Sequence, residues 1–262
     1  MRNKILIIGD LGAGKTQLSN RFTEQPFSPT YYGTIAADYN QFQLNNRIFQ
    51  LVDKSGDKRY QSLLAYIEQD ASLFLYCIDA SQPDLAARLP GYKAAIAEKQ
   101  KHLPKAKMLL IATKRDEESS GKNIALLTRF AKENNYSCIE TSAKANTGID
   151  KLKQEIQRVF NCEENALKKA KLLAIVTTLI RNIEIGKNRK TTGMGSDKVA
   201  ELKKALAAIE QTTDGSFNEQ DTIVKIRGIC IQRRNSWDFF RTPHSVKEFE
   251  NLLLAEAPVG GM

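Results

Sequence analysis

Eight residues near the start of the chain have the types and spacing needed to hold phosphate groups. Residues 9–16 read Gly-Asp-Leu-Gly-Ala-Gly-Lys-Thr, which matches the pattern G-x-x-x-x-G-K-[ST]. Backbone N–H groups in such a loop, together with the N-terminus of a following helix, attract negative charge. We expect Lys15 to bind the β- and γ-phosphates of a nucleotide and the Thr16 hydroxyl to ligate Mg²⁺. A plain glycine turn is the alternative, and the strand–loop–helix context favours the phosphate site.

A second motif, D-x-x-G, begins at Asp53 directly after an apolar run. The Asp53 carboxylate would hold Mg²⁺ through a water molecule, and the Gly56 N–H would meet the γ-phosphate. Because Asp-rich turns have the same pattern, this motif is weak by itself and gains its meaning from the first.

Two short motifs further along predict which base is bound, and each follows an apolar run. They contain Thr113, Lys114 and Asp116 in the first and Ser142, Ala143 and Lys144 in the second. A carboxylate at Asp116 would accept hydrogen bonds from guanine N1–H and the 2-amino group, whereas adenine offers neither donor at these positions. Backbone N–H groups of residues 141–144 would reach guanine O6. Either motif could be a surface loop, but their order after successive strands indicates a guanine site.

The hydrophobic pattern of the first 160 residues predicts the elements that position these motifs. Apolar runs at residues 4–8, 73–78, 107–112 and 137–139 predict buried strands, and residues 38–44 and 47–52 predict a hairpin around Asn45-Asn46. Residues 15–23, 85–101, 123–133 and 147–160 have helical character. Strands that alternate with helices predict an α/β fold with a mostly parallel sheet covered on both faces.

After Phe160 the sequence predicts only helices. They are expected over residues 165–185, from a cap at Ser196 or Asp197 to residue 211, within residues 216–234 and over residues 246–256. The expected apolar stripes are Leu167, Ala170, Ala174, Leu179 and Ile183; Leu202, Leu206 and Ile209; Ile223, Ile226, Ile229 and Cys230; and Phe249, Leu252 and Leu253. These stripes would pack on one another or on the first domain, or form a partner-binding surface. We therefore divide the chain into a domain at residues 1–161 and a helical extension at residues 162–262.

The composition excludes several classes of protein. The 262 residues are 42% hydrophobic and 26% charged, as in an ordinary folded domain. The net charge of +9 comes from basic residues spread over the whole length, which favours a solvated surface over a nucleic-acid groove and leaves weak attraction to an anionic membrane open. The sequence contains no run of 18 apolar residues, so we expect no membrane span. Its four cysteines are widely spaced and it has two histidines, so we expect neither a zinc site nor a disulfide framework.

Together the motifs resemble the Ras superfamily of small GTPases, with a P-loop NTPase fold, and Rab proteins most closely. Residues 140–144 (Glu-Thr-Ser-Ala-Lys) match the family's fifth motif nearly unchanged, and residues 9–10 and 34–39 are also Rab-like. The resemblance covers Met1 to about Phe160. It implies that Thr34 binds Mg²⁺ and senses the γ-phosphate, that Phe27 packs on the guanine ring and that Tyr31 closes over the phosphates.

The residues expected at the site form three groups. Nucleotide contacts are expected from Gly12, Ala13, Gly14, Lys15, Thr16, Gln17, Phe27, Tyr31, Thr34, Gly56, Thr113, Lys114, Asp116, Ser142, Ala143 and Lys144. Thr16, Thr34 and Asp53 are expected around Mg²⁺, and Lys15, Thr34 and Asp57 at the catalytic positions.

The chain departs from the family pattern where water is activated. The catalytic glutamine of the family follows the D-x-x-G glycine, and here that position is Asp57. A glutamine amide both donates and accepts hydrogen bonds, whereas a carboxylate only accepts and adds negative charge beside a phosphoryl group. We therefore predict slow intrinsic hydrolysis, with Asp57 as a general base as the alternative.

Other departures concern regulators and partners. Lys58 replaces the glutamate that exchange factors commonly exploit, and Leu11 stands where relatives carry glycine or serine, so it would crowd an arginine finger. Val52 replaces a tryptophan of the Rab recognition patch. Thr113 replaces the usual asparagine, a change that some branches of the superfamily share, so guanine binding is expected to survive.

The end of the chain also differs from Rab proteins, which end in prenylated cysteines. The last cysteine here is Cys230, so we expect no lipid anchor, and any membrane contact would be indirect or electrostatic, through basic segments such as residues 187–190. The architecture resembles Rab-like effectors that vacuole-dwelling bacterial pathogens deliver into host cells. That resemblance implies a cytoplasmic protein, in host cytosol or on a vesicle surface.

The leading hypothesis is a switch that binds GTP or GDP with Mg²⁺, hydrolyses GTP slowly and acts on vesicle traffic. Its partners would be effectors that contact residues 31–34 and 53–60, together with Rab regulators. The second hypothesis is a non-hydrolysing, GTP-bound scaffold that sequesters Rab partners. A third makes the helical extension the active module, although the extension offers no catalytic constellation.

Overall fold

The computed structural model describes residues 3–30, 33–57, 59, 66–187, 194–231 and 244–255. The chain consists of two compact units, Met1–Gln157 and Arg158–Met262. The predicted boundary at residue 161 stays a prediction, because the helix α5 (Ile149–Lys187) begins in the first unit and ends in the second. Tyr31, Lys58 and residues 188–190 lie outside the described residues.

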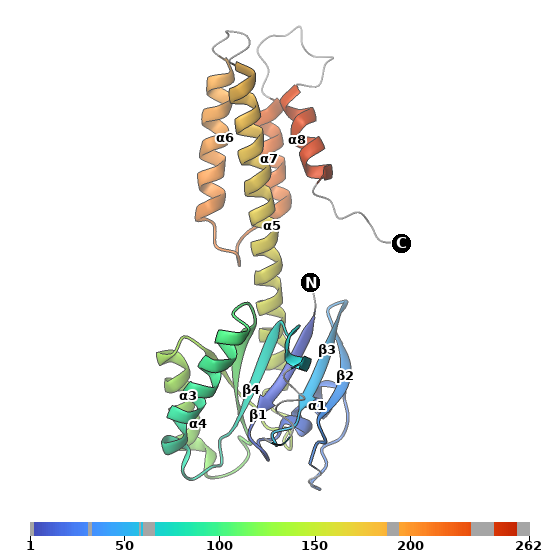
Figure 1. Ribbon diagram of the computed structural model, residues 1–262, viewed down its shortest axis with the longest axis vertical. Helices are drawn as coiled ribbons and strands as arrows, with labels where there is room; N and C mark the ends of the chain where they lie inside the picture. The colour runs from blue at the N-terminus through green and yellow to red at the C-terminus, as the bar shows by residue number, and fades with distance from the viewer. Residues whose placement is uncertain are drawn as a thin grey trace. The chain divides into compact units, whose positions relative to one another are not determined.

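The first unit is built on a six-stranded sheet with the order β2-β3-β1-β4-β5-β6 (Figure 1). Its strands are β1 (Lys4–Gly9), β2 (Ala37–Leu44), β3 (Arg47–Lys54), β4 (Leu73–Asp79), β5 (Lys107–Thr113) and β6 (Ser137–Glu140). Only β2 pairs antiparallel, with β3, and all other neighbours are parallel. The predicted α/β fold with a mostly parallel sheet is confirmed.

The predicted hairpin is present and has the geometry that its turn residues favour. Asn45 and Asn46 have φ angles of 47° and 62°, and Leu44 pairs with Arg47 across the turn. Two successive left-handed residues match the right-handed twist of the flanking strands, and asparagine tolerates that conformation. The turn therefore fixes the register that places Asp38 opposite Asp53.

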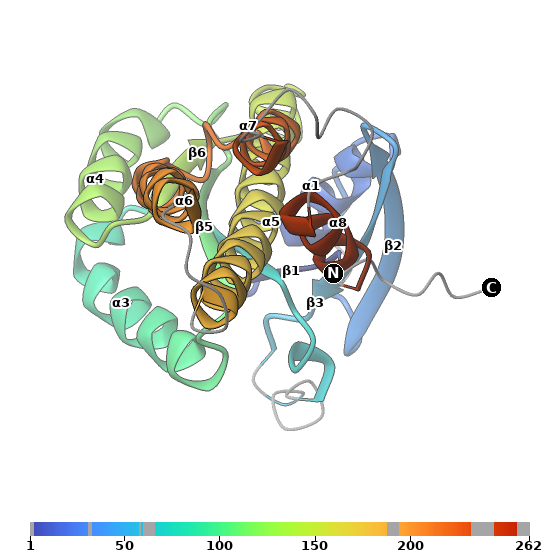
Figure 2. The same ribbon diagram turned by 90° about the horizontal axis from the view of Figure 1, so that it is seen from above.

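Helices cover the sheet on both faces because its strands are apolar on both sides. Helices α3 (Leu85–His102) and α4 (Ser120–Glu133) share one core with alternate strand residues such as Leu6 and Phe74. Figure 2 shows α1 (Lys15–Phe22) and α5 on the opposite face, where Ile5 and Ile7 are fully buried. Helix α4 begins three residues before the expected start.

The described residues of the second unit form helices, as predicted, with a turn at residues 212–218, and the helices pack on one another. It contains the rest of α5 with α6 (Met194–Gln211), α7 (Glu219–Ile231) and α8 (His244–Ala255) (Figure 1). The expected inward residues of α6, α7 and α8 all belong to one apolar core. No helix among the described residues is long and apolar enough to cross a membrane.

Three expectations about the second unit are wrong. The predicted helices at 147–160 and 165–185 are one continuous helix, α5, because no glycine or proline interrupts the residues between them. Of its expected apolar stripe, Leu179 and Ile183 do pack into the core, whereas Leu167, Ala170 and Ala174 are exposed. The buried residues of α5 in this core are Leu172, Ile175, Val176, Leu179 and Ile180. Helix α6 begins at Met194, so neither Ser196 nor Asp197 is its cap.

Candidate functional site

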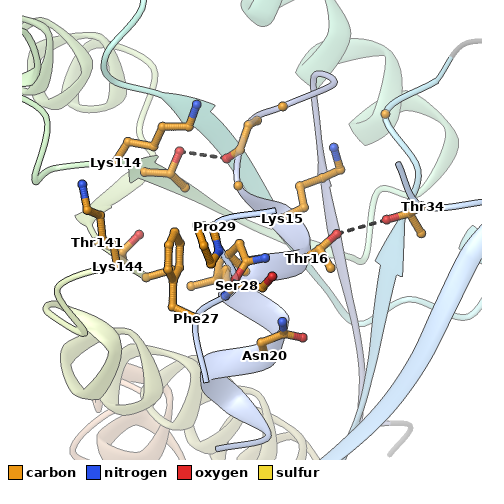
Figure 3. A pocket seen from close by; sticks show the side chains of 18 of the residues that line it. Lys15, Thr16, Asn20, Phe27, Ser28, Pro29, Thr34, Lys114, Thr141 and Lys144 are labelled. Carbon is orange, nitrogen blue, oxygen red and sulfur yellow. Dashed lines mark hydrogen bonds between the residues drawn. The ribbon is translucent and has the colours of Figure 1, made fainter. Parts of the chain in front are cut away.

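The predicted motifs meet in one pocket beyond the carboxyl ends of the strands, where parallel α/β sheets place their ligands. The pocket has a cavity volume of about 390 Å³. Figure 3 shows Lys15 and Thr16 toward one end, and Lys114, Lys144 and the Phe27 ring toward the other. The predicted residues that line it are Gly12, Ala13, Gly14, Lys15, Thr16, Gln17, Phe27, Thr34, Gly56, Thr113, Lys114, Asp116, Ala143 and Lys144.

The remaining predicted residues lie elsewhere. Asp53 is buried behind Thr16, Ser142 is buried against Asp116, and Asp57 does not line the cavity. The pocket also contains Asn20, Ser28 and Pro29, which the sequence reasoning missed. Asn20 lies one helical turn after Thr16, so helical periodicity was the signal that could have found it.

The loop before α1 presents backbone donors as the phosphate prediction requires. Within the described part of the chain, the N–H groups of Gly12, Gly14, Lys15 and Thr16 have no hydrogen-bond acceptor. Gly12 and Gly14 have φ angles of 75° and 80°, a conformation that glycine adopts without strain. Unpaired N–H groups at a helix N-terminus create a site for an anion.

Lys15 is held in the middle of this loop. Its side chain is buried, and its Nζ donates to the carbonyl oxygens of Gly9 at 3.0 Å and Asp10 at 2.7 Å. Burial lowers the pKa of Lys15 below its usual value. A negatively charged ligand would oppose that shift, because it stabilises the charged form of the amine.

Gly56 lies against the same loop. A Cβ atom added at Gly56 would lie 2.6 Å from the Leu11 backbone nitrogen and 2.8 Å from Lys15 Nζ. No larger residue fits without displacing backbone atoms. The D-x-x-G motif and the phosphate loop are therefore in direct contact, as the γ-phosphate prediction requires.

Three oxygen-bearing side chains converge at the predicted metal position. Thr16 Oγ1 lies 3.0 Å from Thr34 Oγ1 and donates to Asp53 Oδ2 at 2.5 Å, while Thr34 Oγ1 lies 3.3 Å from the same carboxylate oxygen. Figure 3 shows the two threonine side chains pointing toward each other. Hydroxyl and carboxylate oxygens are the ligands that Mg²⁺ prefers.

The second oxygen of Asp53 gives an independent indication of a bound cation. Among the described residues, Asp53 Oδ1 is the buried side-chain polar atom that has no hydrogen-bond partner. Burial raises the pKa of Asp53, because the charged carboxylate is separated from water. Such a buried and unsatisfied atom is destabilising unless a ligand compensates it. These residues therefore fit Mg²⁺, directly or through a water molecule.

At the other end of the pocket, Asp116 is oriented by its neighbours. Ser142 Oγ donates to Asp116 Oδ1 at 2.5 Å, and Lys144 Nζ lies 3.8 Å from Oδ2. Lys114 Nζ forms an ion pair with Asp79 at 2.7 Å. Since Oδ2 forms only the long contact with Lys144 among the described residues, the carboxylate retains capacity to accept hydrogen bonds from a ligand.

Thr113 connects the two ends of the site. Its hydroxyl lies within hydrogen-bond distance of two carbonyl oxygens, those of Ala13 at 2.8 Å and Ile78 at 3.1 Å. The residue that replaces the usual asparagine thus still joins the base-binding strand to the phosphate loop. This geometry is consistent with the expectation that guanine binding survives the replacement.

Asp57 forms an ion pair with Arg59 and also accepts a hydrogen bond from the Arg59 backbone. The Arg59 backbone N–H donates to Asp57 Oδ1 at 2.9 Å, and its guanidinium donates to Oδ2 from Nε at 2.9 Å and from Nη2 at 2.6 Å. These hydrogen bonds from Arg59 lower the pKa of Asp57 below its usual value. A carboxylate with a lowered pKa is a weaker base, which argues against Asp57 as a general base.

Comparison with known proteins shows the family of this chain. A family profile described as Ras family matches residues 4–161. Ras-related protein Rab-32 of Sus scrofa is 33% identical over 157 residues, which make up 56% of this chain and 69% of the relative. Ras-related protein Rab5 of Nicotiana tabacum is 32% identical over 161 residues (59% and 79%), and Rab-32 of Homo sapiens is 31% identical over 186 residues (64% and 82%). The chain therefore belongs to the Ras family of small GTPases and is Rab-like.

Proposed function

We propose that this Ras-family protein is a guanine-nucleotide switch that binds GTP with Mg²⁺ and hydrolyses it slowly. Ras-family proteins generally bind GTP or GDP with Mg²⁺ and contact effectors through their switch regions. In this chain Lys15 would hold the β- and γ-phosphates, and Thr16, Thr34 and Asp53 would hold the metal. Mg²⁺ would neutralise charge that develops on the phosphates during hydrolysis.

The observation that carries the slow rate is the Asp57–Arg59 ion pair. Asp57 occupies the position that follows Gly56, where the family uses glutamine to orient water. Both of its oxygens accept hydrogen bonds from Arg59. A carboxylate whose two oxygens already accept hydrogen bonds has no hydrogen to donate to the transition state and does not readily take up a proton.

Single-turnover GTP hydrolysis by the full chain tests this proposal. We expect Asp57→Gln to hydrolyse at least about tenfold faster than wild type, since a glutamine amide restores a donor and removes a charge. The matched control is Asp84→Asn, because Asp84 also forms an ion pair with an arginine, Arg88 at 2.9 Å, and neither residue lines the cavity. Equal rates for wild type and Asp57→Gln would show that the slow-hydrolysis proposal is wrong.

The same ion pair favours a second candidate function, a GTP-bound scaffold that sequesters Rab partners. If no group orients water, bound GTP would persist and the effector surface would remain assembled. The nucleotide that copurifies with the protein separates the two functions: GDP indicates turnover, and GTP that persists over hours indicates the scaffold.

The biological setting follows only from the Rab resemblance. We place the protein in vesicle traffic, with effectors at the switch regions and Rab regulators as partners. Its origin as an effector of an intracellular bacterium stays a prediction.

A further inference from the structure

Arg21 reaches from α1 to the loop that follows β6. Its Nε donates to the Ala143 carbonyl oxygen at 2.6 Å, and its Nη2 lies 3.5 Å from the Lys144 carbonyl oxygen. Ala143 and Lys144 both line the nucleotide pocket, whereas Arg21 does not. The contact spans 122 positions in the sequence, and no motif of the chain indicates it.

We infer that Arg21 is a positioning residue for guanine: by binding the Ala143 carbonyl oxygen it fixes the Ala143–Lys144 peptide, so that the Lys144 N–H meets the O6 atom. This inference rests on the proposed guanine-nucleotide function. It assigns a role in base binding to Arg21, which does not line the nucleotide pocket.

The geometry of the trans peptide explains how Arg21 orients the Lys144 N–H. In a trans peptide the carbonyl oxygen and the N–H of the next residue point in opposite directions. An arginine that binds the Ala143 carbonyl therefore turns the Lys144 N–H away from α1. A cation on the carbonyl oxygen also polarises the peptide, which strengthens the N–H on its other side as a donor.

The peptides on either side of Ala143 and Lys144 form hydrogen bonds within the loop. The Ser142 N–H donates to the Thr147 carbonyl at 3.0 Å, and the Ala145 N–H donates to Ser142 Oγ at 2.9 Å. Between them, the N–H groups of Ala143 and Lys144 have no acceptor in the part of the chain that the structure describes. The loop thus satisfies its outer donors internally and leaves the two central donors at the pocket for a ligand acceptor.

Helix α1 links this contact to the rest of the site. Its first residues, Lys15 and Thr16, lie at the phosphate end of the pocket. At the next position, Gln17 Oε1 accepts a hydrogen bond from the Ser28 N–H at 3.0 Å, beside Phe27. Arg21, a further turn along, holds the O6 loop. A single helix therefore sets the distance between phosphate binding and base binding.

Binding of three diphosphates to the full chain with Mg²⁺ tests the inference, since they differ only at the base edge. GDP carries both O6 and the 2-amino group, inosine diphosphate keeps O6 but lacks the amine, and 6-thioguanosine diphosphate replaces O6 with a weaker sulfur acceptor. We expect Arg21→Gln to raise the Kd of GDP and of inosine diphosphate by about tenfold each. The Kd of 6-thioguanosine diphosphate should rise by no more than about twofold, because less hydrogen bonding to position 6 is lost.

The ratio between ligands on one variant makes the test independent of folding. Loss of folded protein lowers the apparent binding capacity for all three diphosphates equally and leaves their Kd ratio unchanged. Arg21→Lys serves as the conservative variant, and we expect about a threefold rise for GDP, because an ammonium reaches one carbonyl oxygen but lacks the planar fork. The control is Arg129→Gln, an exposed arginine of α4 that pairs with Glu133 and should leave all three constants unchanged.

Two results would overturn the inference and are distinguishable. If Arg21→Gln weakens all three diphosphates equally, or none of them, Arg21 does not act through O6 and only this inference fails. If wild type binds ADP as tightly as GDP, the proposed guanine site itself fails and the inference with it.

Discussion

The two units of this chain bury different kinds of side chain. Every buried polar or charged residue that the structure describes, from Lys15 to Ser142, lies in the first unit. The described core of the second unit consists of apolar side chains from α5, α6, α7 and α8. Buried polar groups cost stability unless they are paired, whereas buried apolar groups add to it. The first unit therefore retains groups that need a ligand, and the second unit is stabilised by packing.

Removing the buried cation of the first unit should have the largest effect. Lys15→Ala deletes charge-assisted contacts to two phosphates, and we expect a loss of about 4 kcal/mol, or roughly a thousandfold in GTP affinity. Titration calorimetry with GTP and Mg²⁺ measures this, and the helical circular dichroism signal should stay at the wild-type level. An affinity within tenfold of wild type would contradict the assignment of Lys15 to the phosphates.

The converse substitution in the second unit should change stability and leave binding intact. Leu202 is fully buried in the α5–α8 core, and Leu202→Ala should lower the free energy of unfolding of that unit by about 3 kcal/mol. Denaturant unfolding followed by circular dichroism measures the change, and GDP affinity should be unaltered. Leu254→Ala is the control, because Leu254 is 72% exposed and its loss should cost less than about 0.5 kcal/mol. A large loss of GDP affinity in Leu202→Ala would show that the two units do not separate packing from binding.

A smaller change in the free energy of unfolding is expected at Asp53, because the charge that would hold the metal also destabilises the protein without ligand. Without nucleotide and Mg²⁺, Asp53→Asn should raise the free energy of unfolding by about 1 kcal/mol at neutral pH, since a buried charge with an unpaired oxygen is replaced by a neutral amide.

The pH dependence of that gain follows from the raised pKa of Asp53. In wild type this carboxyl contributes stability when it is protonated, and the contribution is lost as pH rises through its raised folded-state pKa. The advantage of Asp53→Asn should therefore shrink as pH falls through that pKa toward its usual value. Parallel unfolding curves for the two proteins at all pH values would contradict this account, and addition of Mg²⁺ and GTP should favour wild type.

Much of the first unit could be predicted because its signals are local in sequence. The phosphate loop, the Asn45-Asn46 turn and the alternation of strands with helices each depend on short patterns with a direct physical reason. The helix register of α5 was not predictable in the same way. Leu167, Ala170 and Ala174 fit an apolar stripe nearly as well as the residues that are buried, and only contact with α6 and α7 selects between them.

The sequence alone determined which residues are candidates for binding phosphate, metal and base, because those roles depend on the chemistry of the side chain and its place after a strand. Only the tertiary structure showed that Arg59 binds Asp57, that one Asp53 oxygen has no hydrogen-bond partner among the described residues and that Arg21 contacts the loop at Ala143. Each of these facts depends on the distance between atoms after folding. Residue types and spacing do not encode that distance when the partners are far apart or when several neighbours compete for the same charge.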